Sequence, residues 1–295
     1  MTTHDAVARG RGLRRVRWRL WPWLAVIGAL AAPCLTVGPS PAGADEADLA
    51  EPVAPPGEDH PLEELHSGYR YQPAHVKEMQ DDDIRNPGML WYEHGRKLWS
   101  MPDGEADKSC ADCHNRAEKA MRGVGARYPQ FSQAEARPIG LGQRINLCRS
   151  QNMKAKPWPV GSDAMVAMTT YVRAQSRGMP VRVKTGGQAA PFFEDGKAYY
   201  YRKRGELDTS CAGCHEDNAG EKLGATTISQ GHSNGFPAYR IAAERVETLH
   251  QQFRRCNRRV QAQPLPLGSD TYVNLELYLA WRGSGLPVET PAVRN

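Results

Sequence analysis

The stretch Thr209-Ser210-Cys211-Ala212-Gly213-Cys214-His215 contains the pattern C-x-x-C-H, and Ser109-Cys110-Ala111-Asp112-Cys113-His114 contains it a second time. This pattern is the attachment signature of c-type haem, in which two thiols form thioethers and the adjacent His binds the iron. One copy could be half of a zinc site, but two copies, each preceded by Ser, favour haem over zinc or disulfide chemistry. The sequence therefore predicts two covalently bound haem c groups, attached through Cys110, Cys113, Cys211 and Cys214, with His114 and His215 as iron ligands.

Each motif lies within a longer repeated pattern. Gly95 and Gly196 precede the two motifs at the same spacing, and both are followed by aromatic residues. Gly161-Ser162-Asp163 and Gly268-Ser269-Asp270 each begin a run with helical apolar spacing, in which Ser or Asp can cap the first turn. Each half is expected to contain a helix, a haem motif, an irregular segment and a second helix that crosses the first at the Gly. The predicted fold is mainly α, with two tandem cytochrome c-like domains related by an internal repeat.

Residues 1–44 have the features of an export signal. A basic segment precedes an apolar run and the small residues Ala42-Gly43-Ala44, which form a cleavage site. We therefore expect a periplasmic mature protein without a membrane anchor. Residues 45–85, rich in Pro and acidic side chains, are expected to form an extended N-terminal arm. Domain 1 is placed at residues 86–181, a linker at residues 182–190 and domain 2 at residues 191–295.

The formal net charge of +5 comes from residues 1–44. This segment contains six Arg and one acidic residue, so the remaining chain has equal numbers of basic and acidic side chains. Such a balance gives no reason to expect nucleic-acid binding, which requires a basic surface.

The second iron ligand of each haem can be Met, His or Cys, and this choice sets the haem's chemistry. In the second half no Met follows Met179, which leaves His232, His250 and Cys256. In the first half no His lies between the two haem motifs, which leaves several Met residues and Cys148. Cys is the only ligand type present at a corresponding place in both halves. We therefore expect Cys148 to bind the first iron (haem 1) and Cys256 to bind the second (haem 2).

Three alternatives remain for these positions. Cys148 and Cys256 could form a disulfide, as spare thiols of exported proteins often do. Met153 could bind the iron of haem 1, and His250 could bind that of haem 2. Thiolate ligation, in contrast, would stabilise ferric iron and lower the reduction potential below that of a His/Met cytochrome.

Cys256 lies within the basic segment Gln251-Gln252-Phe253-Arg254-Arg255-Cys256-Asn257-Arg258-Arg259. Cationic neighbours lower the pKa of a thiol, and guanidinium groups bind oxyanions through paired hydrogen bonds. Such a run can also be no more than a solvated helix face. Because Cys148 has fewer basic neighbours, Cys256 is the better candidate for a catalytic residue, with Arg254 and Arg255 as candidate oxyanion-binding residues.

These features together resemble the SoxA family, the dihaem subunits of the SoxAX cytochrome c of bacterial sulfur oxidation. The resemblance covers about residues 60–290 and rests on both haem motifs, the spare Cys of each half and the segment Phe253-Arg254-Arg255-Cys256-Asn257. It implies His/Cys ligation, by His114 and Cys148 at haem 1 and by His215 and Cys256 at haem 2. It also implies that Cys256 is catalytic and occurs as a persulfide.

The resemblance further implies an activity. In the SoxA family the complex joins thiosulfate oxidatively to a cysteine of the carrier protein SoxYZ, as an L-cysteine S-thiosulfotransferase. The electrons leave through the small monohaem subunit SoxX. The family motif has an Arg four positions before the ligand Cys, where this chain has Gln252. The substrate-binding residue therefore stays open between Arg254, Arg255 and, on the C-terminal helix, Arg282.

Two other functions are open on the sequence alone. A non-catalytic dihaem electron-transfer cytochrome would need the same haem motifs without a substrate site. A dihaem peroxidase would need an open iron face and an electron-transfer haem with Met or His as a ligand, and the paired Cys argues against it.

Overall fold

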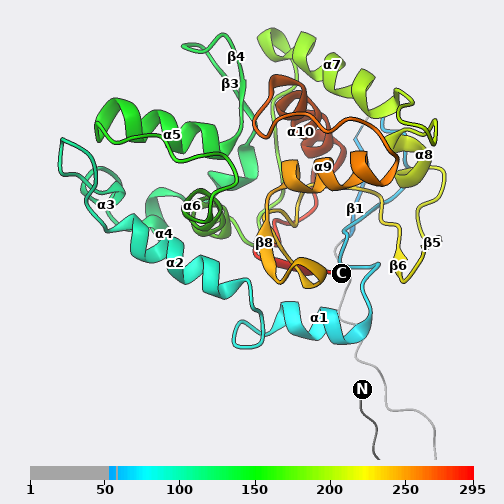
Figure 1. Cartoon of the computed structure of the whole chain (residues 1–295), viewed down its shortest axis with the longest axis horizontal. Helices are drawn as coiled ribbons and strands as arrows, with labels where there is room; N and C mark the ends of the chain where they lie inside the picture. The colour runs from blue at the N-terminus through cyan, green and yellow to red at the C-terminus, as the bar shows by residue number, and fades with distance from the viewer. Residues whose placement is uncertain (1–52, 58) are drawn as a thin grey trace, which may run out of the picture. The chain divides into compact units, whose positions relative to one another are not determined.

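The computed structural model describes residues 53–57 and 59–295, and Figure 1 shows its helices and strands. The predicted signal peptide, residues 1–44, and the first part of the predicted arm lie outside the described residues. The described chain is mainly helical, and its two halves repeat the same series of helices, which confirms the predicted fold class.

Each half contains four principal helices in the same order. In the first half these are α2 (Met89–Trp99), α3 (Cys110–His114), α5 (Leu141–Asn152) and α6 (Asp163–Ala174). In the second half they are α7 (Ala190–Tyr201), α8 (Cys211–His215), α9 (Leu249–Arg259) and α10 (Asp270–Arg282). They are accompanied by α1 (Ala74–Asp81), α4 (Ala117–Ala120) and 3-10 helices at Gly125–Arg127, Gly187–Ala189 and Ile241–Ala243.

The strands are short and form small sheets. Three antiparallel pairs join β1 (Val53–Ala54) to β2 (Leu65–His66), β3 (Gln130–Ser132) to β4 (Arg137–Ile139) and β5 (Lys222–Leu223) to β6 (Thr226–Thr227). A three-stranded sheet has the order β8 (Arg245–Glu247), β7 (Ala238–Arg240), β9 (Ala292–Arg294). In this sheet β7 is antiparallel to β8 and parallel to β9. The sheet therefore joins the end of the chain to the segment that leads into α9.

Serine side chains occupy the starts of four of these helices. The hydroxyls of Ser109 and Ser210 accept hydrogen bonds from the backbone N–H of the third residue of α3 and α8, respectively. Ser162 caps α6 in the same way, as its Gly-Ser-Asp motif predicts. Ser269 holds the corresponding position before α10 but makes no capping hydrogen bond with its side chain, which differs from the prediction. A cap of this kind contributes about 1 kcal/mol.

The principal helices of each half cross at the predicted glycine. A Cβ atom placed on Gly95 of α2 would lie 2.2 Å from the backbone oxygen of Ala167 in α6. A Cβ atom on Gly196 of α7 would lie 2.0 Å from the backbone oxygen of Asn274 in α10. Because any larger side chain would clash with the backbone at these points, glycine sets the distance between the two helices in both halves.

The two halves contact each other through reciprocal ion pairs. Arg137 of β4 lies 2.9 Å from Asp270 at the start of α10, and Arg245 of β8 lies 2.9 Å from Asp163 at the start of α6. Each pair is partly exposed and contributes at most about 1 kcal/mol. The same arginine of each repeat thus meets the same aspartate of the other, so equivalent surfaces face each other.

The described part of the arm packs on the second half. Leu65 of β2 is fully buried and forms a small apolar cluster with Leu286. Ser67 donates a hydrogen bond to the carboxylate of Glu289. The arm therefore covers surface of its own chain beside the second haem motif.

Candidate functional site

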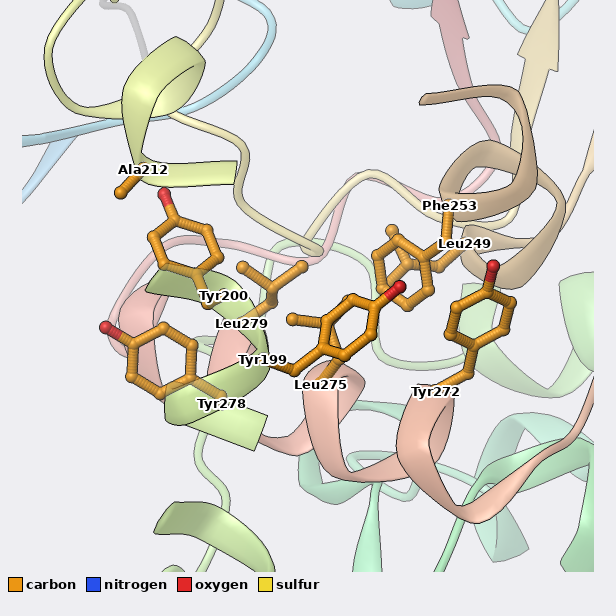
Figure 2. Packing of buried hydrophobic residues seen from close by; sticks show 9 residues of the cluster. All are labelled: Tyr199, Tyr200, Ala212, Leu249, Phe253, Tyr272, Leu275, Tyr278 and Leu279. Atoms are coloured by element: carbon orange, nitrogen blue, oxygen red, sulfur yellow. The ribbon is translucent and has the colours of Figure 1, made fainter. Parts of the chain in front are cut away.

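The second half contains a cavity between α8 and α9. Cys211, Cys214 and His215 line the cavity from α8, and Cys256 lines it from α9. Its apolar lining includes Tyr199, Tyr200, Leu249, Phe253, Leu275 and Leu279. Figure 2 shows these side chains within the hydrophobic cluster of the second half. Both attachment cysteines, the predicted proximal histidine and the predicted second ligand of this half thus share one apolar cavity.

His215 is oriented by the loop that follows β6. Its Nδ1 lies 2.7 Å from the carbonyl oxygen of Ser229, so Nδ1–H donates to that oxygen and Nε2 keeps its lone pair. Burial lowers the pKa of His215, which keeps the ring neutral. Gly231, with φ at +76°, lets the loop pass close, because a Cβ there would lie 2.7 Å from the imidazole Cγ. A neutral imidazole with a free, fixed Nε2 is the form that binds haem iron.

The pKa of the Cys256 thiol is shifted in the opposite direction from the one that its basic sequence neighbours predict. Burial raises the pKa of the Cys256 thiol, and the nearby Cys211 raises it further, whereas Gln252, Arg259 and Arg240 act in the opposite direction. The basic segment therefore does not by itself give a low-pKa thiol, because desolvation outweighs the nearby cations. The thiolate form requires a stronger positive charge at the sulfur, such as a bound metal ion.

His250 and His232 were the other candidate ligands in this half. The backbone N–H of Gly268 donates to Nδ1 of His250 at 3.0 Å, so its Nε2–H donates to Glu276 at 3.1 Å. Both ring nitrogens of His250 are thus engaged between α9 and α10. His232 also lines the cavity, where burial, followed by Arg282 and more weakly by His60 and His215, lowers its pKa. Its Nε2 lies 3.1 Å from Gln230, and its Nδ1 is buried without a hydrogen-bond partner among the described residues. The contacts of His250 disfavour that residue, and the equivalent positions of Cys148 in α5 and Cys256 in α9 favour Cys256 over His232.

The first half places the corresponding residues together in a more open setting. Burial raises the pKa of the Cys110 thiol to about 11; Arg149 acts in the opposite direction, and the nearby Cys148 of α5 contributes to the rise. The ring of His114, which is exposed, lies 5.9 Å from that of Trp99. All six cysteines of the described residues are free, which disfavours the Cys148–Cys256 disulfide. Met153 is buried at the end of α5.

Arg282 is not placed where a substrate-binding residue would have to lie. Its side chain is 0% exposed, and its Nη1 donates to the backbone oxygen of Gln230 at 2.8 Å. Its Nη2 lies 3.0 Å from Glu216, and the guanidinium lies over the ring of Tyr200. Arg282 therefore supports the His215 side of the site and is closed to a diffusing anion.

The other two predicted arginines, Arg254 and Arg255, differ in their position relative to the cavity. Arg255 lines the cavity that contains Cys256 and donates a hydrogen bond to Glu247. Arg254 lines a neighbouring surface hollow together with Arg255 and Arg258, but it does not line the cavity itself. Only Arg255 is thus placed where a ligand beside Cys256 could meet it.

Sequence reasoning missed Arg240, which ends β7 and lines the same cavity. Burial lowers the pKa of Arg240 to about 10, with Arg255 as the second cause. The neighbouring sequence gave no indication that Arg240 would reach the site, because β7 lies in the irregular middle of the repeat. The three-stranded sheet places it beside α9. Arg259, which the basic segment contains, also lines the cavity.

The cavity fits a haem c group together with a small anion. Among the described residues that line the cavity, the buried polar atoms without a hydrogen-bond partner include Nε of Arg240, Nε of Arg255, Oε1 of Gln252 and Nδ1 of His232. Buried polar atoms without partners are costly, which favours a polar ligand at this end. The apolar walls and the two thiols beside a free imidazole nitrogen match a covalently held porphyrin.

Comparison with known proteins supports the interpretation of this cavity as a haem c site. The model of the family described as SoxA/TsdA, cytochrome c domain, matches residues 94–181 and 195–288. A SoxA subunit of Pseudaminobacter salicylatoxidans is 41% identical over 252 residues, which cover 85% of this chain and 88% of that protein. A SoxA subunit of Rhodovulum sulfidophilum is 39% identical over 234 residues, 79% of this chain and 82% of that protein. Both carry the name L-cysteine S-thiosulfotransferase subunit SoxA.

A solved structure shows the same fold. The crystal structure of SoxXA from P. pantotrophus superposes with a TM-score of 0.79 at 37% identity, covering 83% of this chain and 93% of that chain. Fold and site together define a tandem c-type cytochrome that binds haem c. The chain belongs to the SoxA family, as the resemblance predicted. No helix of the described residues is long and apolar enough to cross a membrane.

Proposed function

We propose that this chain is the dihaem subunit of a periplasmic enzyme that joins thiosulfate oxidatively to a cysteine of a sulfur-carrier protein. The relatives' enzyme name supports the reaction, and the solved SoxXA complex supports a small monohaem partner of the SoxX type. The carrier is of the SoxYZ type. The mature protein begins after a signal peptide at residues 1–44 and consists of an arm at 45–85, domains at 86–181 and 191–295, and a linker at 182–190.

The observation that carries this proposal is the position of Cys256. Its sulfur shares one cavity with the haem-attachment thiols, and the guanidinium groups of Arg240 and Arg255 line the same cavity. A simple electron carrier does not require two partly buried guanidinium groups beside an iron ligand. A site for a sulfur oxyanion does, because paired N–H donors match sulfonate oxygens.

The proposed reaction balances in atoms, protons and electrons. The carrier thiol and thiosulfate form one S–S bond, and the thiol proton and two electrons leave. Haem c supplies one-electron redox chemistry when bound, so a second electron acceptor is needed, which the monohaem partner provides. Four residues hold the two haems' irons, His114 and Cys148 at haem 1 and His215 and Cys256 at haem 2.

The chain's own residues bind and orient the substrates. Arg240 and Arg255 hold the sulfonate oxygens of thiosulfate in the cavity, and Glu247 fixes Arg255 by an ion pair. Cys256, the catalytic residue, presents the sulfur at which thiosulfate and the carrier thiol meet. The apolar walls exclude water, which strengthens the hydrogen bonds to the anion. Arg254 and Arg282 take no part in substrate binding.

Turnover tests this proposal. The purified protein with its small partner is mixed with thiosulfate and carrier protein, and reduction of an acceptor cytochrome is followed for wild type, Cys256→Ala and the control Arg254→Ala on the same helix. We expect wild type and Arg254→Ala to turn over and Cys256→Ala, with both haems still attached, to be inactive. Full activity of Cys256→Ala, or no response of wild type to thiosulfate, would overturn the proposal.

A further inference from the structure

We infer that Gln252 is a positioning residue, whose amide N–H donates to the Cys256 sulfur, fixes its orientation and raises the reduction potential of haem 2. The inference rests on the proposed function, because it takes Cys256 as the iron ligand of that haem.

The geometry of α9 brings the two side chains together. Gln252 and Cys256 are four residues apart, so they lie on the same face of the helix in adjacent turns. Nε2 of Gln252 lies 3.3 Å from Sγ of Cys256, within hydrogen-bond distance for sulfur. Both side chains line the cavity. The amide therefore meets the sulfur at the site where the reaction is proposed.

The side-chain amide of Gln252 has no other hydrogen-bond partner among the described residues. Oε1 of Gln252 is buried and has no hydrogen-bond partner among the described residues. A glutamine that served only to stabilise the helix would place this oxygen in water or on a backbone N–H. Instead, the contact with the sulfur is the polar interaction that defines the orientation of the amide.

A hydrogen bond to a ligating sulfur has a known direction of effect. The N–H group stabilises negative charge on the sulfur, so the sulfur donates less charge to the iron. Ferric iron is then stabilised less, and the reduction potential rises. One lone pair of the sulfur is also occupied, which limits the directions from which a second sulfur atom can approach.

The first half provides an internal reference. Arg144 lies four residues before Cys148, at the position that corresponds to Gln252, and its side chain is exposed. A change at Gln252 should therefore alter haem 2 and leave haem 1 unchanged. The two haems of one protein can be titrated in the same experiment.

Three substitutions separate hydrogen bonding from packing. Gln252→Met has a similar length and no N–H group, Gln252→Glu has the same shape but offers a charged acceptor, and Gln252→Arg keeps N–H donors in a larger side chain. The reduction potentials of both haems are measured by optical redox titration of the holoprotein, and the low-spin ferric signals by electron paramagnetic resonance.

We expect the potential of haem 2 to fall in the order Arg, Gln, Met, Glu. In Gln252→Met the ratio of oxidised to reduced haem 2 at a fixed potential should rise about tenfold, which is about 59 mV for a one-electron couple. The haem 2 resonance signal should shift as well, and haem 1 should keep its wild-type potential. Recovery of the potential in the bulky Arg variant, but not in the closely matched Met variant, supports hydrogen bonding over packing.

Two results would overturn the inference in different ways. An unchanged haem 2 potential in Gln252→Met and Gln252→Glu, or an equal shift in all three variants, would contradict the role of Gln252 and leave the proposed function standing. A haem 2 signal that is the same in wild type and Cys256→Ala would show that Cys256 is not the ligand, and the proposed function would fall together with the inference.

Discussion

Replacing Gly196 by Ala adds one methyl group at the point where α7 crosses α10. The new Cβ would lie 2.0 Å from the backbone oxygen of Asn274 and 2.5 Å from its carbonyl carbon, whereas ordinary contact begins at 3.4 Å. Both clashing atoms belong to helical backbone, so no side chain can rotate away. The helices must therefore move apart by more than about 1 Å at the crossing, which loosens a buried, close-packed contact.

The cost can be estimated from two opposing effects. Overpacking of a buried contact costs up to about 3 kcal/mol. Alanine is a better helix former than glycine by about 1 kcal/mol, which offsets part of that cost. The net destabilisation is about 2 kcal/mol, which lowers the midpoint of thermal unfolding by about 4–8 °C for a protein of this size.

The assay is thermal unfolding of the holoprotein, followed by circular dichroism. Gly95→Ala, at the equivalent crossing, should behave like Gly196→Ala. Gly186→Ala is the matched control, because a Cβ there meets nothing within 4 Å. If Gly196→Ala unfolds at the same temperature as Gly186→Ala, the close crossing does not require glycine and the reasoning is refuted.

Two further predictions concern the arginines of the site. Arg240→Leu should raise the KM for thiosulfate by about 10–100-fold, since hydrogen bonds to charged groups contribute about 1.5–3 kcal/mol, and steady-state kinetics measure this change. The control Arg254→Leu should keep its KM within about twofold, and a larger effect there than at Arg240 would contradict the assignment. Arg282→Met should destabilise the fold by about 3 kcal/mol, because it leaves the nearby carboxylate of Glu216 unpaired in a largely buried place. A variant of normal thermal stability whose KM for thiosulfate is raised would show instead that Arg282 binds substrate.

Much of this fold could be predicted from sequence because its signals are local and repeated. The C-x-x-C-H motifs specify attachment chemistry by themselves. The common spacing of Gly95 and Gly196 predicts a close helix crossing in each half, and the structure shows both contacts. The arrangement of α5 and α9, which places Cys148 and Cys256 at equivalent positions, follows from the same repeat.

The electrostatics of the site could not be predicted in the same way. Arg240 reaches the cavity through pairing of β7 with β8 and with the C-terminal strand β9, which is a long-range contact. Arg282 is directed inward by the packing of α10, although its sequence neighbours gave no such indication. The pKa of Cys256 depends on how deeply its helix is buried, so counting neighbouring charges gave the wrong direction.

Identification of the reaction product is the direct test of the proposed transferase function. After turnover with thiosulfate, the carrier protein is analysed by mass spectrometry while the electrons delivered to the acceptor cytochrome are counted. We expect one thiosulfate joined through its outer sulfur to one carrier cysteine for every two electrons, with wild type and not with Cys256→Ala. Reduction of the acceptor while the carrier stays unmodified would contradict the proposed transferase function and would identify the chain as an electron-transfer cytochrome.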